Sequence, residues 1–159
     1  MFYTQEMRQV APGTAGEKVT EMNEWTAEAV TDSIPAITRE IGRELDALDC
    51  SAQARRKINV ALDELLSNIA YYAYAPGIGK VTVQMRYDET DGTVFLTFID
   101  SGIPYNPLEK ADPDITLAAA NRPVGGLGVL MVKKKMDGME YRRENGQNIL
   151  TVRKRIRED

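Results

Sequence analysis

The sequence predicts an α+β domain, a two-layer α/β sandwich in which helices cover one face of a mainly antiparallel, mixed sheet. Three observations predict this class. Residues 32–48 and 51–74 carry apolar side chains at helical spacing, and residues 81–87 alternate apolar with polar side chains. The 159 residues are the length of one domain.

The N-terminal residues are expected to lie outside the packed domain. Residues 1–16 end in Ala-Pro-Gly-Thr-Ala-Gly, a composition that interrupts regular structure, so they are interpreted as an N-terminal arm. Residues 17–159 then form a single domain. Its first predicted element is an edge strand at 18–29.

Two helices follow in the prediction. The first begins at Asp32 or Ser33, either of which can cap it, and Pro35 suits its first turn. The second extends from 51 to 74 and ends at Ala75-Pro76-Gly77. Their apolar stripes are Ile34, Ile37, Ile41, Leu45 and Leu48 in the first helix, and Ile58, Leu62, Leu65, Ile69 and Tyr72 in the second.

The second half of the chain predicts strands around a long connection. An alternating strand at 81–87 turns at Asp91-Gly92 into a more uniformly apolar strand at 93–99, which favours a central position in the sheet. Residues 100–124 form a long polar connection, and a loop of this length inside a small domain usually has a function. A third helix is expected at 129–136, and a final hairpin pairs 139–143 with 148–155 around Asn145-Gly146.

Composition excludes several kinds of chemistry. The chain has no histidine and one cysteine, so it alone builds no Ser-His-Asp triad, Cys-His pair or CxxC site. A net charge of −4 argues against nonspecific binding to nucleic acid or anionic lipid. Neither a membrane span nor a signal peptide is expected, and the lone cysteine favours a reducing, cytoplasmic location.

The first candidate feature is Glu64 with Asn68. Four residues apart on the second helix, their side chains share one face, at the edge of the apolar stripe. A carboxylate and an amide there suit a base and a ligand for a hard metal such as magnesium. The alternative is a solvated helix flank.

The second and third features are turns. Asp100-Ser101-Gly102 follows an apolar strand, where the carboxylate can accept a hydrogen bond from an exocyclic amine such as that of adenine; an ordinary strand-ending turn is the alternative. Gly125-Gly126-Leu127-Gly128 opens the third helix, where backbone N–H groups and the helix dipole attract phosphate; a flexible hinge is the alternative. The surrounding residues match neither a Walker motif nor the dinucleotide fingerprint.

Taken together and in this order, the three features resemble the Bergerat ATP-binding fold of the histidine-kinase-like ATPase superfamily. The likeness extends over about 30–156 and is greatest to anti-sigma regulatory factors with serine/threonine protein kinase activity. It is carried by Ala-Leu-Asp-Glu-Leu-Leu-Ser-Asn at 61–68, Asp-Ser-Gly-Ile-Pro-Tyr-Asn-Pro-Leu at 100–108, and Asp-Ile-Thr-Leu at 114–117 leading through Arg122-Pro123 to Gly128. The chain departs from many members of the superfamily at Pro104, where they have a second glycine.

The resemblance implies a role for each site residue. Glu64 is the catalytic general base, and Asn68 binds magnesium and the phosphates. Asp100 binds the adenine amine, with Gly102 beside the base. Gly126, Leu127 and Gly128 wrap the phosphates, and Thr151 on the final strand completes the adenine site through water.

The predicted function is an MgATP-dependent serine/threonine kinase that acts as a partner switch and phosphorylates a STAS-type anti-sigma factor antagonist. A sigma factor or another regulator is a further expected partner, and the resemblance implies a homodimer. A histidine kinase needs a phosphoacceptor histidine that this sequence lacks, and a gyrase-type ATPase needs a following transducer domain. Two alternatives stay open: a non-catalytic binding module gated by ATP or ADP, and a slow ATPase acting on water.

Overall fold

Six strands form one sheet in the part of the chain that the computed structural model describes, residues 4–9, 21–109 and 127–157. The strands are β1 (Thr4–Gln9), β2 (Glu21–Glu28), β3 (Lys80–Asp88), β4 (Thr93–Asp100), β5 (Gly138–Glu144) and β6 (Gln147–Arg155). Their order across the sheet is β1-β2-β3-β4-β6-β5. The predicted α+β class is confirmed, and every pairing among these strands is antiparallel.

The central position predicted for β4 is confirmed, since it lies between β3 and β6. Val94, Leu96 and Phe98 are almost fully buried on the face that packs against the helices. The strand ends at Asp100, which is itself buried. A carboxylate therefore lies at the end of a core strand.

The edge of the sheet differs from the prediction. The segment expected at 18–29 forms β2, but it is the second strand, because β1 pairs with it from Thr4↔Thr26 to Gln9↔Glu21. Residues 4–9, which were expected to belong to an arm outside the domain, thus form the outermost strand, β1. Its sequence, Thr-Gln-Glu-Met-Arg-Gln, lacks apolar alternation, and strand pairing through the backbone does not require it.

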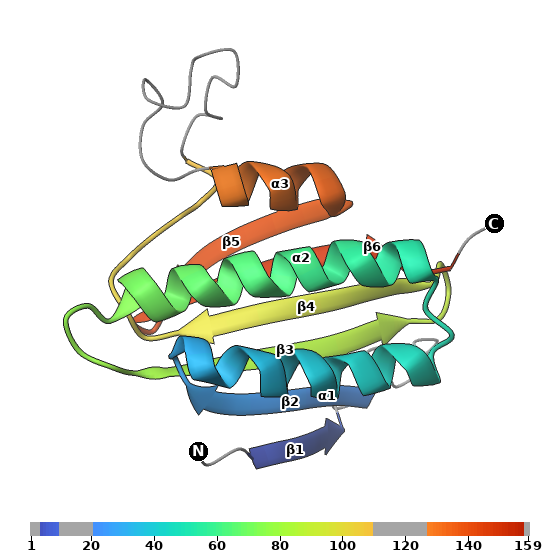
Figure 1. Cartoon of the computed structure of the whole chain (residues 1–159), viewed down its shortest axis with the longest axis horizontal. Coiled ribbons are helices and arrows are strands. Elements are labelled where there is room, and N and C mark those ends of the chain that lie inside the picture. Colours follow the sequence, from blue (N-terminus) through green and yellow to red (C-terminus); the bar gives the residue numbers. More distant parts are fainter. Residues whose placement is uncertain (1–3, 10–20, 110–126, 158–159) are drawn as a thin grey trace.

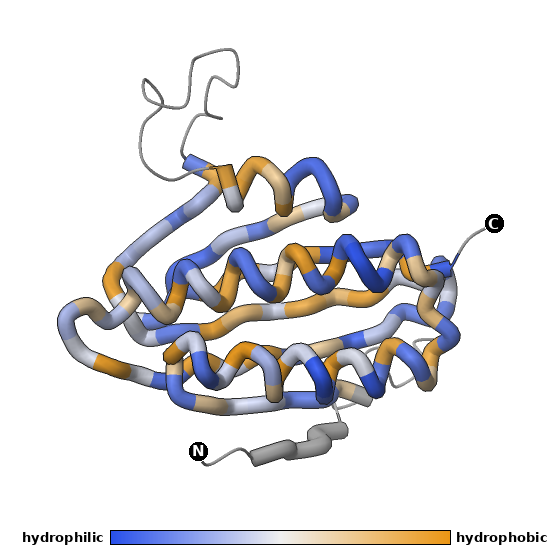
Figure 2. The backbone as a smooth tube through the Cα atoms, viewed as in Figure 1, coloured by the Kyte–Doolittle hydropathy of each residue, from blue (hydrophilic) through white to orange (hydrophobic). Residues whose placement is uncertain are grey.

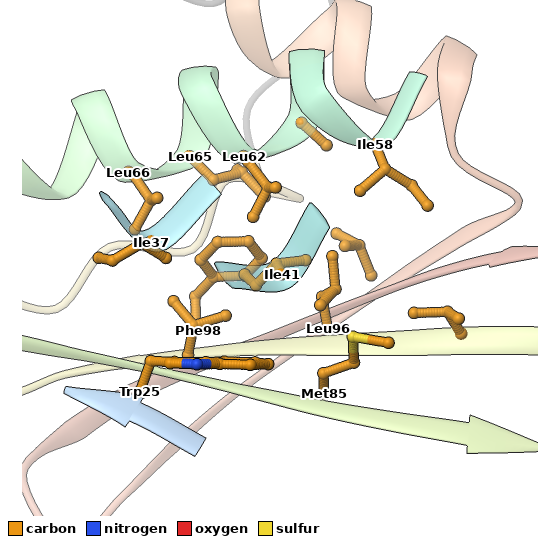
Figure 3. Close-up of a cluster of buried hydrophobic side chains, with 14 of the residues drawn as sticks. Trp25, Ile37, Ile41, Ile58, Leu62, Leu65, Leu66, Met85, Leu96 and Phe98 are labelled. Atoms are coloured by element: carbon orange, nitrogen blue, oxygen red, sulfur yellow. The ribbon is translucent and has the colours of Figure 1, made fainter. Parts of the chain in front are cut away.

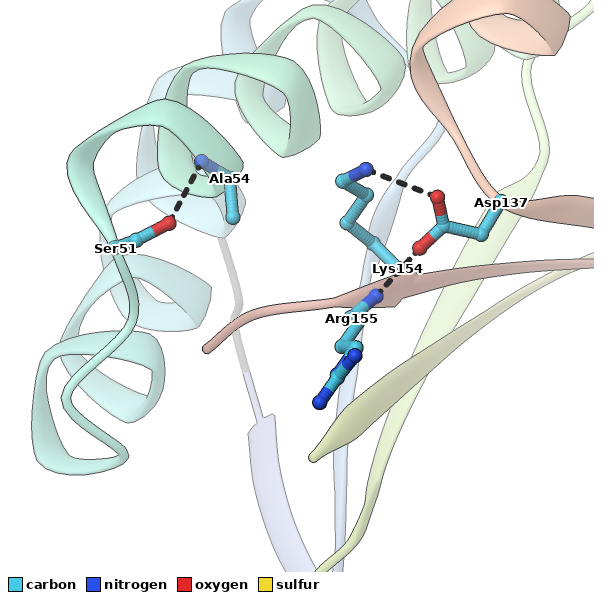
Figure 4. A network of polar contacts seen from close by, with 5 residues as sticks. All are labelled: Ser51, Ala54, Asp137, Lys154 and Arg155. Atoms are coloured by element: carbon cyan, nitrogen blue, oxygen red, sulfur yellow. Dashed lines mark hydrogen bonds and ion pairs between the residues drawn. The ribbon is translucent and has the colours of Figure 1, made fainter. Parts of the chain in front are cut away.

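Helices α1 (Ile34–Ala47), α2 (Ala52–Asn68) and α3 (Leu127–Lys135) lie over the same face of the sheet (Figure 1). A 3₁₀ turn, η1 (Thr31–Ser33), leads into α1, and Pro35 lies in the first turn of that helix, as expected. The Ser51 hydroxyl caps α2 by accepting a hydrogen bond from the Ala54 amide at 3.1 Å (Figure 4). None of the helices in the described ranges is long and apolar enough to cross a bilayer.

The helix predicted to extend to Tyr74 changes its winding at Asn68. Residues Ile69–Ala73 form a π-helical turn, η2. A π turn takes more residues per turn than an α-helix, so the side chain that follows Leu65 and Ile69 onto the core face is Ala73 and not Tyr72. Ala73 is accordingly buried, whereas Tyr72 is 63% exposed.

The core lies between the helices and the inner face of the sheet. Trp25 from β2, Phe98 from β4 and Ile41 from α1 are among its fully buried side chains (Figure 3). Hydrophobic and hydrophilic residues alternate along α1 and α2, whereas β4 is mostly hydrophobic (Figure 2). Most of the predicted stripe is in the core: Ile37, Ile41, Leu45, Ile58, Leu62 and Leu65 are buried, and Ile34, Leu48 and Ile69 are partly buried against it.

The predicted C-terminal hairpin is present. Asn145 and Gly146 join β5 to β6 with φ of 51° and 75°, conformations that asparagine and glycine tolerate best. Where α3 passes into β5, the Asp137 carboxylate accepts hydrogen bonds from the Lys154 ammonium at 3.0 Å and the Arg155 amide at 2.7 Å (Figure 4). These contacts fasten the end of α3 to β6.

Candidate nucleotide site

A cavity of about 520 Å³ opens between α2, the start of α3 and the ends of β4 and β6. Most of its wall is apolar, with Leu65, Ile69, Phe98, Val129 and Leu150 among the lining residues. The polar lining residues other than tyrosines are Glu64, Asn68, Asp100 and Asn148. Segments far apart in the sequence therefore supply one concave site, the usual form of a small-molecule pocket.

Glu64 and Asn68 form the first polar group, one turn apart on α2. A Cβ built on Gly128 would lie 2.1 Å from Glu64 Oε2, so the carboxylate lies against the backbone at the start of α3. Among the described residues neither side chain has a hydrogen-bond partner. Both side chains line the cavity beside the start of α3, where the helix dipole adds a positive field.

Asp100 forms the second polar group and is only 6% exposed. Its Oδ1 accepts hydrogen bonds from the Gly102 amide at 2.9 Å and from Asn148 Nδ2 at 2.9 Å. Oδ2 accepts none from the residues that the structure describes. One carboxylate oxygen is held by the protein, and the other is left for a donor on a ligand.

Asn148 is a cavity residue that the sequence analysis missed. It lies on β6 directly opposite Asp100 of β4, and it is 5% exposed. Its position follows from strand register, which the sequence alone did not establish. An asparagine early in a predicted strand was the only available signal.

Thr151, expected to complete the adenine site, does not reach this cavity. Its hydroxyl is hydrogen-bonded to that of its cross-strand partner Thr97 at 2.9 Å. Because side chains alternate along a strand, and Phe98 and Leu150 line the cavity, Thr97 and Thr151 point to the opposite face of the sheet. That expectation is corrected: the cavity residue of β6 next to Asp100 is Asn148.

Gly102 lies beside the cavity and not among its lining residues. A Cβ there would be 2.2 Å from the Ala73 carbonyl oxygen, and the next amide, of Ile103, donates to that same oxygen at 2.9 Å. Glycine therefore allows the loop after β4 to touch the π turn. Of the glycine-rich turn, Leu127 and Gly128 line the cavity, while Gly126 lies outside the described residues, as does most of the long connection.

The Asn68 carboxamide, beside Glu64, fits a magnesium ion that arrives with phosphates. No group of three or more acidic, cysteine or histidine side chains gathers as a metal site in the described ranges. Magnesium is typically bound by one or two protein oxygens together with substrate phosphates and water. The Asn68 carboxamide oxygen, lining the cavity one turn from Glu64, suits that mode.

The whole arrangement suits a ligand with a flat apolar body and an anionic tail. The apolar wall can cover the body, Asp100 can accept a hydrogen bond from it, and the start of α3 can face the anion. A nucleoside triphosphate has these properties. Fold and site together define a nucleotide-binding domain.

Comparison with known proteins identifies the family. The model of the histidine kinase-like ATPase domain matches residues 27–154, and the chain belongs to that family. A serine/threonine-protein kinase of Bordetella bronchiseptica, BtrW, is 28% identical over 102 residues, which are 64% of this chain and 71% of the relative. The predicted family and enzyme class agree with these comparisons.

Two further comparisons agree with the first. The serine-protein kinase RsbW of Bacillus mycoides is 25% identical over 100 residues, and the match spans 60% of this chain and 61% of that relative's length. A solved structure of the RsbU and RsbW domains of a Mycobacterium tuberculosis protein superposes with a TM-score of 0.56 at 15% identity. That superposition covers 82% of this chain and 32% of the other, and it supports the fold.

Proposed function

We propose that the protein is a cytoplasmic MgATP-dependent serine/threonine kinase that works as a partner switch, phosphorylating a STAS-type anti-sigma factor antagonist. The proposal is supported by the family and by relatives that are serine and serine/threonine kinases. The single observation that carries it is that Glu64, Asn68 and Asp100 line one cavity with the start of α3.

In the proposed reaction, Glu64 takes the proton of a serine or threonine hydroxyl on the partner protein. The hydroxyl oxygen forms a bond to the γ-phosphorus, the bond from that phosphorus to the β,γ-bridging oxygen breaks, and ADP leaves. Backbone amides at the start of α3 stabilise charge on the transferring group, and magnesium, held by Asn68 and the phosphates, supplies further charge neutralisation when bound. Phosphoryl transfer depends mainly on positioning and electrostatics, so the chemistry needs no histidine.

The direct test mixes the protein with MgATP and a STAS-domain protein from the same genome and measures intact masses. The partner is expected to gain one phosphate. Glu64→Gln, which keeps the shape of the side chain but cannot take the proton, is expected to slow transfer by about 100-fold or more. Asp63→Asn is the matched control, because Asp63 is the preceding residue on α2 and is exposed outside the cavity.

Each outcome separates the proposal from its alternatives. No phosphate on the partner, with ATP binding confirmed, favours a nucleotide-gated binding module. Release of ADP without a modified partner favours an ATPase acting on water. Native rates in Glu64→Gln contradict the assignment of Glu64 as the base.

The magnesium role of Asn68 has its own test. Asn68→Ala removes the carboxamide oxygen from the cavity, so we expect ATP affinity to lose most of its dependence on magnesium. Calorimetric titrations with ATP, with and without magnesium, measure this. An unchanged magnesium dependence contradicts the role.

The proposal includes a homodimer and a second partner, a sigma factor or another regulator. Both come from the family resemblance. Light scattering after size exclusion is expected to give twice the chain mass of 17.7 kDa. A mass of one chain at micromolar concentration contradicts the dimer.

A further inference from the structure

We infer that Asn148 is a positioning residue that sets how Asp100 recognises the base of the nucleotide, so that it determines selectivity for a 6-amino purine. The inference rests on the proposed function only in requiring that the cavity bind a nucleotide. It does not require phosphoryl transfer.

The contacts of Asn148 leave its amide no free capacity for a ligand. Nδ2 donates to Asp100 Oδ1 at 2.9 Å and to the Ile103 carbonyl at 2.8 Å. Oδ1 accepts from the Tyr105 amide at 3.2 Å, the Tyr141 hydroxyl at 2.6 Å and Arg143 Nη1 at 3.1 Å. With both amide protons and both lone pairs engaged, Asn148 acts on a ligand through its neighbours.

These partners also fix which way the amide faces. Arg143 carries only donors, so the oxygen of Asn148 must face it, and the NH₂ group must then face Asp100. Arg143 is itself held, because it donates to the carbonyls of Gly102 at 2.9 Å and Gly146 at 3.1 Å. The orientation of the amide is therefore determined from the side of β5 and the hairpin turn.

The consequence falls on Asp100. Its Oδ1 receives donors from both Asn148 and Gly102, which hold the carboxylate in one orientation and leave Oδ2 as the oxygen that can accept from a ligand. An acceptor pairs with the exocyclic amine of adenine and opposes the carbonyl oxygen at the same position of hypoxanthine. Selectivity for the base thus depends on a donor at position 148, a residue that need not touch the base.

Asn148→Asp replaces that donor by an acceptor of nearly the same shape. The introduced carboxylate presents an oxygen to Asp100 Oδ1 where the native amide presents a proton, so Asp100 loses the contact that holds its carboxylate in orientation. We expect the ratio of the ITP to the ATP dissociation constant, about tenfold or more in the native protein, to fall close to one. Gln147→Glu makes the same chemical change at the neighbouring residue, outside the cavity, and is expected to keep the native ratio.

A second pair of variants keeps the test decisive if Asn148→Asp does not fold. The variants Asn148→Thr and Asn148→Val introduce side chains that have the same shape as each other and suit a strand. Only threonine offers Asp100 a hydrogen-bond donor. We expect the threonine variant to keep the preference for ATP over ITP within about threefold of the native value and the valine variant to lose it. A role limited to stability gives both variants the same ratio.

The measurement is calorimetric titration of the full chain with MgATP and MgITP. The inference is overturned if Asn148→Asp keeps the native ratio, or if the threonine and valine variants share one ratio. A native protein that binds neither nucleotide overturns the inference and the proposed function together. A native protein that prefers ATP but transfers no phosphate to a STAS partner contradicts the kinase proposal alone.

Discussion

Gly128 determines where the Glu64 carboxylate can lie, because Glu64 Oε2 occupies the space that a Cβ at position 128 would fill. In Gly128→Ala the flexible end of Glu64 must move, whereas the backbone of α3 can stay in place. We expect phosphate transfer to fall by about 100-fold, the usual consequence of displacing a catalytic group by about 1 Å. The melting temperature should change little, and partner phosphorylation followed by mass spectrometry measures the loss.

Met131→Ala is the control for that substitution. Met131 lies on α3 one turn further along, is 41% exposed and does not line the cavity. Its replacement should leave transfer unchanged. Full activity in Gly128→Ala contradicts the proposed placement of Glu64.

At the scale of elements, the π turn η2 and the loop after β4 hold each other at one end of the cavity. The Ile103 amide donates to the Ala73 carbonyl at 2.9 Å, and the Tyr74 hydroxyl accepts from the Ser101 amide at 2.7 Å. Gly102 makes this approach possible. Asn68 directly precedes η2, and Asp100 directly precedes the loop. The contact between η2 and the loop therefore fixes the Asn68 and Asp100 side chains relative to each other.

Gly102→Ala should therefore destabilise the protein. Its new Cβ meets backbone, the Ala73 carbonyl group, and no flexible side chain can move aside. We expect the free energy of unfolding to fall by about 1–3 kcal/mol, as for other overpacked sites. Urea denaturation followed by Trp25 fluorescence measures it, and an unchanged midpoint contradicts the close approach.

The hydrogen bonds of Asp137 with Lys154 and Arg155, which join the end of α3 to β6, give a prediction that depends on pH. Partial burial of Asp137 raises the pKa of its carboxyl group. The hydrogen bonds from the Arg155 amide and Lys154, together with the charges of Lys154 and Arg153, lower the pKa by more than burial raises it. The pKa of Asp137 therefore lies below the usual 3.8. Because the pKa of Asp137 is lower in the folded state than in the unfolded state, its carboxylate stabilises the protein at pH values above the unfolded-state pKa. This contribution is lost as the pH falls through the folded-state pKa.

Asp137→Asn should then lower the free energy of unfolding at pH 7 by less than about 1 kcal/mol, because the carboxylate is partly exposed to solvent. The difference from the native protein should shrink as pH falls below 3.8, the ordinary pKa of an aspartate. Urea denaturation at pH 7 and at lower pH measures both values. A difference that grows on acidification contradicts the sign of the pKa shift, and Asp63→Asn serves as the exposed control.

The elements that sequence predicted are those whose signal is local. The burial of α1, β3 and β4 follows from apolar spacing within each segment, and the hairpin turn from Asn145-Gly146. The π turn was missed because one extra residue per turn changes no residue type, and it moved Tyr72 out of the core. Strand β1 was missed because its pairing is carried by backbone groups.

For the whole molecule, the site depends on how distant segments meet. Sequence predicted Glu64, Asn68 and Asp100 as site residues, and the fold brings all three to one cavity. It failed at β6, where finding Asn148 in place of Thr151 required the register with β4, which shows which residue lies opposite Asp100. A shift by an odd number of residues reverses the face of a strand, so an error of three placed the predicted residue on the far side of the sheet.

The core joins the same segments in one cluster of buried side chains. A single cluster of buried residues includes side chains from β2, α1, α2, β3, β4, α3 and β6. Trp25, the only tryptophan of the chain, is fully buried within it and therefore reports on the core as a whole. We expect unfolding in urea to give the same midpoint by Trp25 fluorescence and by far-ultraviolet circular dichroism.

Leu62→Ala sharpens this last prediction. Leu62 is fully buried on α2, so its truncation should remove about 2–5 kcal/mol of stability, through lost burial and the cavity left behind. Because α2 and the sheet share one core, both signals should move to the same lower midpoint. If circular dichroism shows a separate, earlier transition while Trp25 fluorescence keeps its native midpoint, the helices unfold independently of the sheet, and the single cooperative core is contradicted.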